Sequence, residues 1–175
     1  MNIQQTRREF LQLASALIAF PAFPAQAPAE RVVTIVGVGA KGTTAEGETV
    51  ETARLSDPYG VIEDAPRSSL YWVDNSTHRV LRLDYKTKKI SIVAGTGTAG
   101  YSGDGGLAKL AQLAQPHEIR FDSKGNLYVV ERDNFVVRRI NMKSGIISTF
   151  AGTPGSKGFS GDGGMATKAQ FNQPH

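Results

Sequence analysis

Three rings stand at matching points of a repeated pattern and are the side chains best suited to ligand chemistry. His117 and His175 each follow a Gln-Pro pair, and Tyr59 follows Pro58 in an earlier, weaker copy. Two imidazoles from neighbouring repeats could share a divalent metal ion or line a polar pocket. The alternative is that each ring packs beside its proline or hydrogen-bonds a nearby turn, and we favour this structural role over a metal site.

Two charged residues after His117 break the repeat. Glu118 and Arg120 stand where the earlier copy has Gly60 and Ile62. A functional site should break a repeat, because a ligand-binding group has no reason to recur in every unit. Glu118 and Arg120 alternate along one expected strand, so both side chains should lie on one face. The candidate ligand-binding residues are therefore His117, Glu118, Arg120, His175 and Tyr59.

Carboxylates recur in glycine-rich loops, as Asp104, Asp162 and Glu46. Calcium takes about six to eight oxygen ligands, so one carboxylate per loop makes Asp104 and Asp162 weak metal candidates. We expect Asp104 instead to cap a short helix at residues 107–113, with Ala111 and Leu113 pointing inward. No nucleophile elbow, zinc-binding His-Glu-x-x-His helix or phosphate-binding loop occurs in the sequence, so no catalytic residue is assigned.

These residues belong to a repeat with a period of 57 to 58 residues. Gly-Asp-Gly-Gly at 103–106 returns at 161–164, and Gln-Pro-His at 115–117 returns at 173–175. Ile-Ser-Ile-Val-Ala-Gly-Thr at 90–96 returns as Ile-Ser-Thr-Phe-Ala-Gly-Thr at 147–153. A weaker copy precedes them. Such a period marks a solenoid or propeller built from one supersecondary unit.

Within each unit the apolar residues alternate with period two, which is typical of strands. The complete second unit predicts strands near residues 118–122, 126–131, 135–141 and 146–151, joined by short turns. Four antiparallel strands on a fixed repeat predict an all-β fold of β-propeller blades. Blades are expected near residues 58–94 and 116–151, with an incomplete third from residue 171, or about two and a half blades in all. Trp72 occupies the repeat position that Val129 has in the next copy, and it is expected to pack between blades.

The stretches 77–82 and 134–139, each between a Leu-Tyr-x-Val-Asp/Glu strand and an Ala-Gly strand, resemble the core of the NHL repeat. The Ala-Gly-Thr, Ser-Gly-Asp-Gly-Gly and Gln-Pro-His stretches resemble the bacterial, teneurin-type NHL subgroup. This resemblance covers residues 31–175 and implies a propeller, often of about six blades. The Asn-His-Leu signature is imperfect, since the first copy reads Thr-His-Arg and the second Asn-Phe-Val, which weakens a ligand role for His78.

The N-terminus resembles a twin-arginine translocation signal. Residues 6–12 read Thr-Arg-Arg-Glu-Phe-Leu-Gln, with Gln12 in place of the usual lysine, and a short apolar run follows at 13–20. Small residues at 27 and 29 predict cleavage after Ala29. Residues 1–29 are thus expected to be a signal peptide and residues 30–175 a propeller segment. A folded, bacterial, periplasmic or extracellular protein is implied, with no stable membrane span after signal removal.

Charge and composition limit the classes of partner that the protein can bind. The formal charge of +4 is spread along the chain without a block of like charges, which disfavours nucleic acid, and there is no cysteine. The sequence ends at the entry to a new inner strand. We therefore expect a truncated sequence or fragment, the alternative being a ring built from several identical chains.

Two functions from different classes fit this pattern. We favour an exported NHL-repeat propeller that acts as a binding or interaction scaffold for a protein, peptide or carbohydrate ligand. The alternative is a metal-dependent propeller hydrolase or lyase, similar to a sugar lactonase, with an axial metal site. The cofactor is unknown, and a divalent metal is implied only under that alternative.

Overall fold

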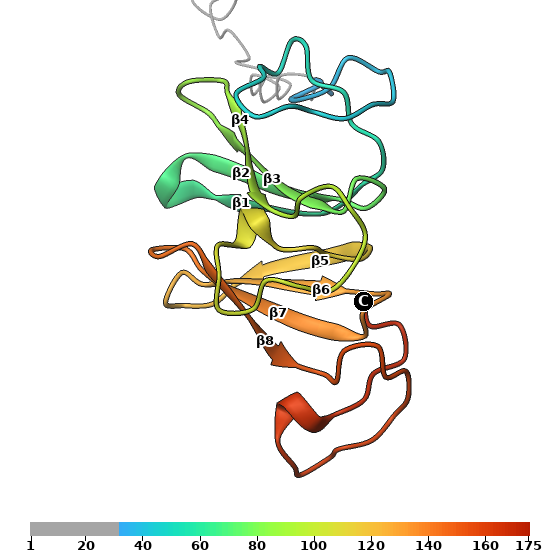
Figure 1. The fold of residues 1–175 in the computed structure, drawn as a ribbon. Coiled ribbons are helices and arrows are strands. Elements are labelled where there is room, and N and C mark those ends of the chain that lie inside the picture. Colours follow the sequence, from blue (N-terminus) through green and yellow to red (C-terminus); the bar gives the residue numbers. More distant parts are fainter. Residues whose placement is uncertain (1–31) are drawn as a thin grey trace, which may run out of the picture. The chain divides into compact units, whose positions relative to one another are not determined.

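The computed structural model describes residues 32–175, and the expected signal segment, residues 1–29, lies outside that range. Residues 58–151 form two four-stranded antiparallel sheets in which neighbouring strands are also neighbours in sequence (Figure 1). The first sheet holds β1 (Pro58–Asp64), β2 (Ser69–Asp74), β3 (Arg79–Asp84) and β4 (Ile90–Ala94). The second holds β5 (Pro116–Phe121), β6 (Leu127–Glu131), β7 (Val136–Asn141) and β8 (Ile146–Ala151). The all-β fold of propeller blades is confirmed.

The strands of the second sheet begin and end within two residues of their expected positions, because the alternation of apolar residues in the sequence corresponds to alternating burial in the structure. In β6, Leu127, Val129 and Glu131 are fully buried, whereas Tyr128 and Val130, which alternate with them, are only half-buried. One face of the second sheet therefore packs against the first sheet, and the other does not. Alternation of this kind fixes the register, since a slip by one residue would turn every apolar side chain to the wrong face.

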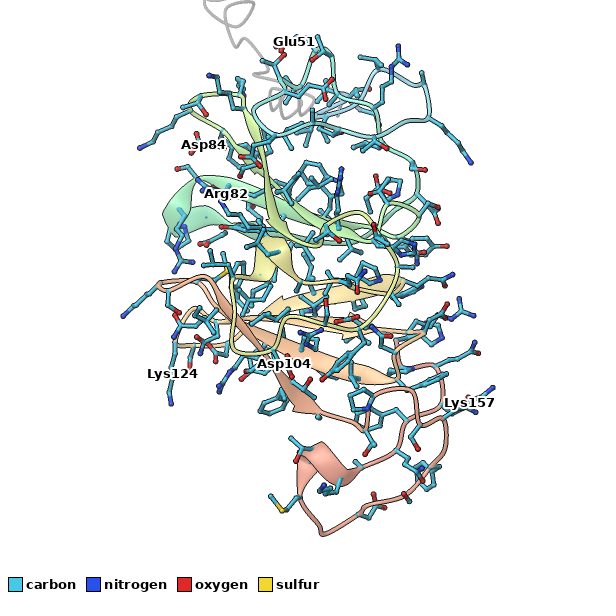
Figure 2. All side chains as sticks on the ribbon, in the orientation of Figure 1. Glu51, Arg82, Asp84, Asp104, Lys124 and Lys157 are labelled. Carbon is cyan, nitrogen blue, oxygen red and sulfur yellow. The ribbon has the colours of Figure 1, made fainter. Side chains whose placement is uncertain are left out.

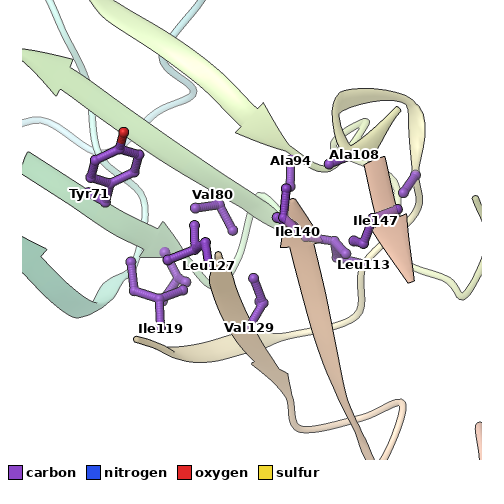
Figure 3. Packing of buried hydrophobic residues seen from close by; sticks show 12 residues of the cluster. Tyr71, Val80, Ala94, Ala108, Leu113, Ile119, Leu127, Val129, Ile140 and Ile147 are labelled. Atoms are coloured by element: carbon purple, nitrogen blue, oxygen red, sulfur yellow. The ribbon is translucent and has the colours of Figure 1, made fainter. Parts of the chain in front are cut away.

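The main hydrophobic core lies between the two sheets (Figure 3). Tyr71 and Val80 from the first sheet belong to one buried cluster with Ile119, Leu127 and Ile140 from the second. β5 lies against both β1 and β2, which makes the first strands of the two sheets the point of closest approach. Burying such side chains stabilises the fold by about 25 cal/mol for each Å² of apolar surface removed from water.

A second core covers the opposite face of the first sheet. Trp72 is 3% exposed and packs with Leu81, Leu83 and Ile90. The segment that precedes the first sheet contributes Ala53 and, at the edge, other apolar side chains. Trp72 is thus a packing residue, as expected from the sequence.

The helix expected at residues 107–113 does not form, and this prediction is wrong. Only a short 3-10 turn, η2 (Ala108–Leu110), is present, and Asp104 does not cap it. The reason is that the loop pairs with the second sheet: the Ala108 N–H donates to the Gly145 carbonyl at 2.8 Å, and the Gly105 N–H donates to the Ile147 carbonyl at 2.8 Å. Two further short turns, η1 (Ala65–Arg67) and η3 (Ala166–Lys168), complete the elements.

The close approach of β1 and β5 depends on a glycine. Gly60 has φ of +27°, and a Cβ built there would lie 2.6 Å from the His117 carbonyl oxygen and 2.8 Å from the Glu118 Cα. Both contacts are with backbone, so neither can be relieved by a side-chain rotation. The two strands could not lie this close with any larger residue at position 60.

We predict that Gly60→Ala lowers the free energy of unfolding by about 2 kcal/mol or more, because the sheets must separate to admit the methyl group. The matched control is Gly105→Ala: Gly105 also has positive φ, +82°, but a Cβ there meets nothing within 4 Å. That change should cost only about 1 kcal/mol, from backbone strain. Urea unfolding monitored by Trp72 fluorescence measures both, and equal losses would contradict the packing explanation.

Candidate functional site

The structure brings the three predicted rings into one stack. The ring centroids of Tyr59 and His117 lie 4.5 Å apart with planes tilted by 38°. The rings of His117 and His175 lie 4.7 Å apart and meet edge to face, with an interplanar angle of 79°. Positions separated by one repeat in sequence therefore touch in space, and they form a continuous surface of rings where the first strand of each sheet begins.

Backbone geometry positions these rings. Gln115 and Gln173 precede the two Pro-His pairs, and both have left-handed backbone conformations, with φ of +45° and +49°. The pairing of β5 with β6 skips His117, which is the extra residue of a β-bulge. A bulge re-aims its side chain out of the regular alternation, so His117 can turn toward its neighbours in the stack.

Buried carboxylates hold the approach to each inner strand. Asp74 is fully buried and accepts hydrogen bonds from the backbone N–H groups of Ser56 and Asp57, at 3.0 and 3.1 Å. At the matching place, Glu131 accepts from the Ala114 N–H at 2.9 Å. The acidic residue at the end of the second strand of each sheet therefore has a structural role. Its hydrogen bonds hold the backbone just before Tyr59 and just before His117.

His117 is the most constrained member of the stack. Burial lowers its pKa below the ordinary 6.5, and the nearby charges of His175 and Arg132 act in the same direction. Glu118 and Asp57 oppose them. The buried Nδ1 of His117 has no hydrogen-bond partner among residues 32–175. Buried polar atoms are rarely left unpaired. This nitrogen is covered by its neighbours, so a ligand group could pair with it only after the surrounding side chains shift.

Glu118 and Arg120 lie on β5 next to the stack, but they are paired with each other. Their charged atoms are 2.8 Å apart, with side chains 32% and 65% exposed. Arg120 also donates to the Ile119 carbonyl at 2.7 Å. An ion pair this exposed contributes little to stability, about 0 to 1 kcal/mol, so both groups remain available to a ligand.

A buried ionic cluster that was not expected from the sequence lies between the second sheet and the loop at residues 101–104. Arg138 and Glu131 are both fully buried, with Arg138 Nη1 3.2 Å from Glu131 Oε1. Arg138 Nη2 lies 2.7 Å from Asp104 Oδ1, and the guanidinium sits 4.8 Å from the Tyr101 ring centroid. The signal was present: position 138 is Arg where the preceding repeat has Leu81, a break of the kind that marks Glu118 and Arg120.

The electrostatics of this cluster are dominated by burial. Burial raises the pKa of Glu131 to about 7, against the attraction of Arg138 and a hydrogen bond from Asn134. Burial also acts on Asp104, yet its pKa is lowered because Thr149 and Arg138 stabilise the carboxylate. The Thr149 N–H donates to Asp104 Oδ2 at 3.0 Å, which holds the loop against β8.

The metal role of Asp104 and Asp162 stays a prediction. Asp104 is engaged by Arg138, Thr149 and the Tyr101 hydroxyl, whereas Asp162 is exposed on the last loop. Among residues 32–175 no three His, Cys, Asp or Glu side chains converge as a metal site would require.

A hollow of about 350 Å³ opens on the first sheet, lined by Tyr59, Val61 and Trp72 among others. The repeat shows what this surface is. Val61 is 61% exposed, but its counterpart Ile119 is 1% exposed because the first sheet covers it. The hollow therefore resembles a surface on which a neighbouring sheet packs and not a ligand pocket.

Comparison with known proteins places this geometry in a family context. The family model of the teneurin NHL domain matches residues 26–158. Over 91 residues the chain is 34% identical to the chloroplastic protein SUPPRESSOR OF QUENCHING 1 of Arabidopsis thaliana, a match that covers 52% of this chain and 8% of that protein. Over 99 residues it is 30% identical to NHL repeat-containing protein 2 of Bos taurus, covering 56% and 14%.

Among solved structures, the chain is similar to a protein of unknown function from Bacteroides thetaiotaomicron, with a TM-score of 0.60 and 27% identity. That match covers 67% of this chain and 28% of the other. The chain thus spans a small part of the length of each of these proteins. The family-model match includes both sheets together with Tyr59 and His117, and it ends before His175.

The buried ion pair predicts a large, pH-dependent effect of Arg138→Met. Loss of Arg138 raises the pKa of Glu131 further, so at pH 8 the variant must either bury the carboxylate charge without a counter-ion or bind a proton, which should cost about 3 to 5 kcal/mol. At pH 5 Glu131 is protonated in the variant, so the loss should be smaller. The double variant Glu131→Gln with Arg138→Met should recover part of the loss at pH 8. Urea unfolding of all three variants measures the coupling, and equal losses at both pH values would contradict it.

Proposed function

Because the chain belongs to the teneurin NHL domain family, we propose that it acts as an exported binding scaffold whose ring stack recognises a protein, peptide or carbohydrate ligand. The observation that carries this proposal is the contact of Tyr59, His117 and His175, which brings one ring from each of three successive repeats to the start of the inner strands. A surface built in this way grows with every repeat and presents edges and faces of rings together.

The chemistry of the site supports binding. The stack offers faces and edges of rings, and Glu118 and Arg120 beside it supply an acceptor and donors that can exchange their mutual pair for a ligand. Rings give apolar contact area while polar atoms fix orientation, the combination found in ligand sites. Within residues 32–175 the site lacks a third converging metal ligand. Binding is therefore better supported than metal-assisted hydrolysis or elimination.

Export is part of the proposal. The motif at residues 6–12 carries the paired Arg7 and Arg8 followed by an apolar run, the arrangement of a twin-arginine signal. No helix in the described part of the chain is long and apolar enough to cross a membrane. Passage in the folded state would suit a protein whose sheets must already pack on one another.

We predict that His117→Ala weakens ligand binding at least tenfold, because it removes the central ring of the stack. The chain is screened on arrays of glycans and of peptides, and the affinity of each hit is measured by calorimetry. The control is Thr167→Ala, an exposed residue of η3. Hits that bind the His117→Ala variant as tightly as the unaltered chain would exclude the ring stack as the site.

Replacing Arg7 and Arg8 together by Lys should stop export and leave the unprocessed chain in the cytoplasm, because the translocation route reads the arginine pair rather than positive charge. Fractionation and immunoblotting of a tagged chain measure this. Lys41→Arg and Lys109→Arg serve as conservative controls elsewhere in the sequence. Unchanged export of the double Lys variant would show that the segment is not a twin-arginine signal.

A further inference from the structure

The strand order places four turns at the same end of the two sheets, namely the end at which β1, β3, β5 and β7 finish. This end is called the edge. β1 is joined to β2 by residues 65–68, and β3 to β4 by residues 85–89. The second sheet repeats this with residues 122–126 and 142–145. In an antiparallel meander alternate turns lie at the same end, and the registers confirm it, since Ser69 faces both Asp64 and Asp84. The turns lie together at the left of Figure 1.

These four turns carry cations that the sequence scatters. Arg67 and Lys124 occupy matching places in the first turns of the two sheets, and Lys86 and Lys143 match in the second turns. Lys88 adds a further charge beside Lys86. Lys89 also lies in this turn, and all five lysines of the four turns are exposed. The recurrence at a spacing of one repeat means that each sheet brings at least two cations to the same edge, which the spread of charge along the chain does not reveal.

The turn geometry explains why the lysines point outward. Asp84 Oδ1 accepts hydrogen bonds from the Lys86 and Thr87 N–H groups, at 3.0 and 2.9 Å. Asn141 Oδ1 does the same for Lys143 and Ser144, at 3.0 and 3.1 Å. These are Asx turns, in which the short side chain folds back onto the backbone. The acidic or amide group is used to build each turn, and the lysine side chain is left in solvent.

The basic edge is continuous from one sheet to the next. Arg67 pairs with Asp64 and lies with its guanidinium 5.8 Å from the Phe121 ring centroid of the second sheet. Its Nη2 would lie 2.8 Å from a Cβ at Gly125, so it reaches the turn that carries Lys124. Within residues 32–175 none of the salt bridges involves a lysine of these turns. Figure 2 shows Lys124 at this edge and Lys157 at the opposite one.

We propose that this basic edge, formed by residues 65–68, 85–89, 122–126 and 142–145, is a second binding site and takes an anionic polysaccharide. It does not rest on the function proposed for the ring stack, which lies where the first strands begin, at the other end of the sheets. Cations separated by one repeat suit a chain that carries carboxylates or sulfates at intervals. The exposed hydroxyl of Ser123, next to Lys124 in sequence, can bond to sugar hydroxyls.

Two other polyanions fit the surface less well. Binding of single-stranded nucleic acid relies on aromatic side chains on which bases stack, and binding to an anionic membrane relies on apolar or aromatic anchors beside the cations. None of the exposed large hydrophobic side chains found in residues 32–175 belongs to the four turns. Leu107, which is 42% exposed, lies against the turn at Gly145, but one side chain is not a cluster of anchors. Tyr85 and Met142 are the large apolar side chains there, and both are partly buried. A carbohydrate needs neither feature.

The test compares two variants of the same charge in the full chain. The edge variant replaces Lys86, Lys88, Lys124 and Lys143 by Gln, and the control replaces Lys41, Arg54, Lys157 and Lys168 by Gln, all of which lie outside the four turns. Binding to polygalacturonate and to dextran sulfate is measured by calorimetry in low salt, with neutral dextran as the uncharged probe. Each exposed cation should contribute roughly two- to fivefold, so the edge variant should bind at least tenfold more weakly and the control within about twofold.

Other outcomes decide against the proposal. Equal losses in the two variants would mean that only net charge matters, and no loss in either would place binding elsewhere. Binding to single-stranded DNA or to vesicles with anionic lipid as tightly as to polygalacturonate would make the edge a general polyanion surface. Binding should also fall steeply between low salt and about 0.5 M salt, because exposed charges are screened over a few ångströms there. Circular dichroism checks that both variants remain folded.

Discussion

The packing of one sheet against the next is the constraint on which the rest of this protein depends. A four-stranded sheet of this kind has two apolar faces and cannot bury both alone. In the first sheet Tyr71 and Val80 are buried because the second sheet covers them, whereas the matching Tyr128 and Val137 are only half-buried. The close approach of the inner strands at Gly60 follows from the same packing, and so does the meeting of rings from different repeats.

Much of the fold was predictable because the same strand pattern occurs in two copies of the repeat, and each copy supports the assignment of strands in the other. Alternation of apolar residues, seen twice at one spacing, identifies strands more securely than any single stretch can. The loop at residues 103–113 was not predictable in the same way. Asp104 and the residues after it fit a capped helix locally, but the edge of β8 offers backbone partners that a local reading cannot see. Long-range pairing overrode the local preference.

The site was predictable in part. The equivalence of Tyr59, His117 and His175 followed from the repeat, and the structure adds that the rings touch. The pairing of Glu118 with Arg120 also needed coordinates, because an alternating pair on one face can equally point toward a channel. Glu131 was taken only as a strand residue. Glu131 is a charged residue at a position that alternates with buried apolar residues, which indicates a buried partner. That partner, Arg138, was identified only from the structure.

The presence of Arg138 where the preceding repeat has Leu81 couples the second sheet to the loop that leads into it. Glu131 lies on β6, in the same sheet as Arg138, whereas Asp104 lies in the loop before β5. If this loop moved away, the buried guanidinium would lose one of its two carboxylate partners, and breaking a buried ion pair is costly. Local opening of the loop should therefore be rare, and the loop and the sheet should unfold together.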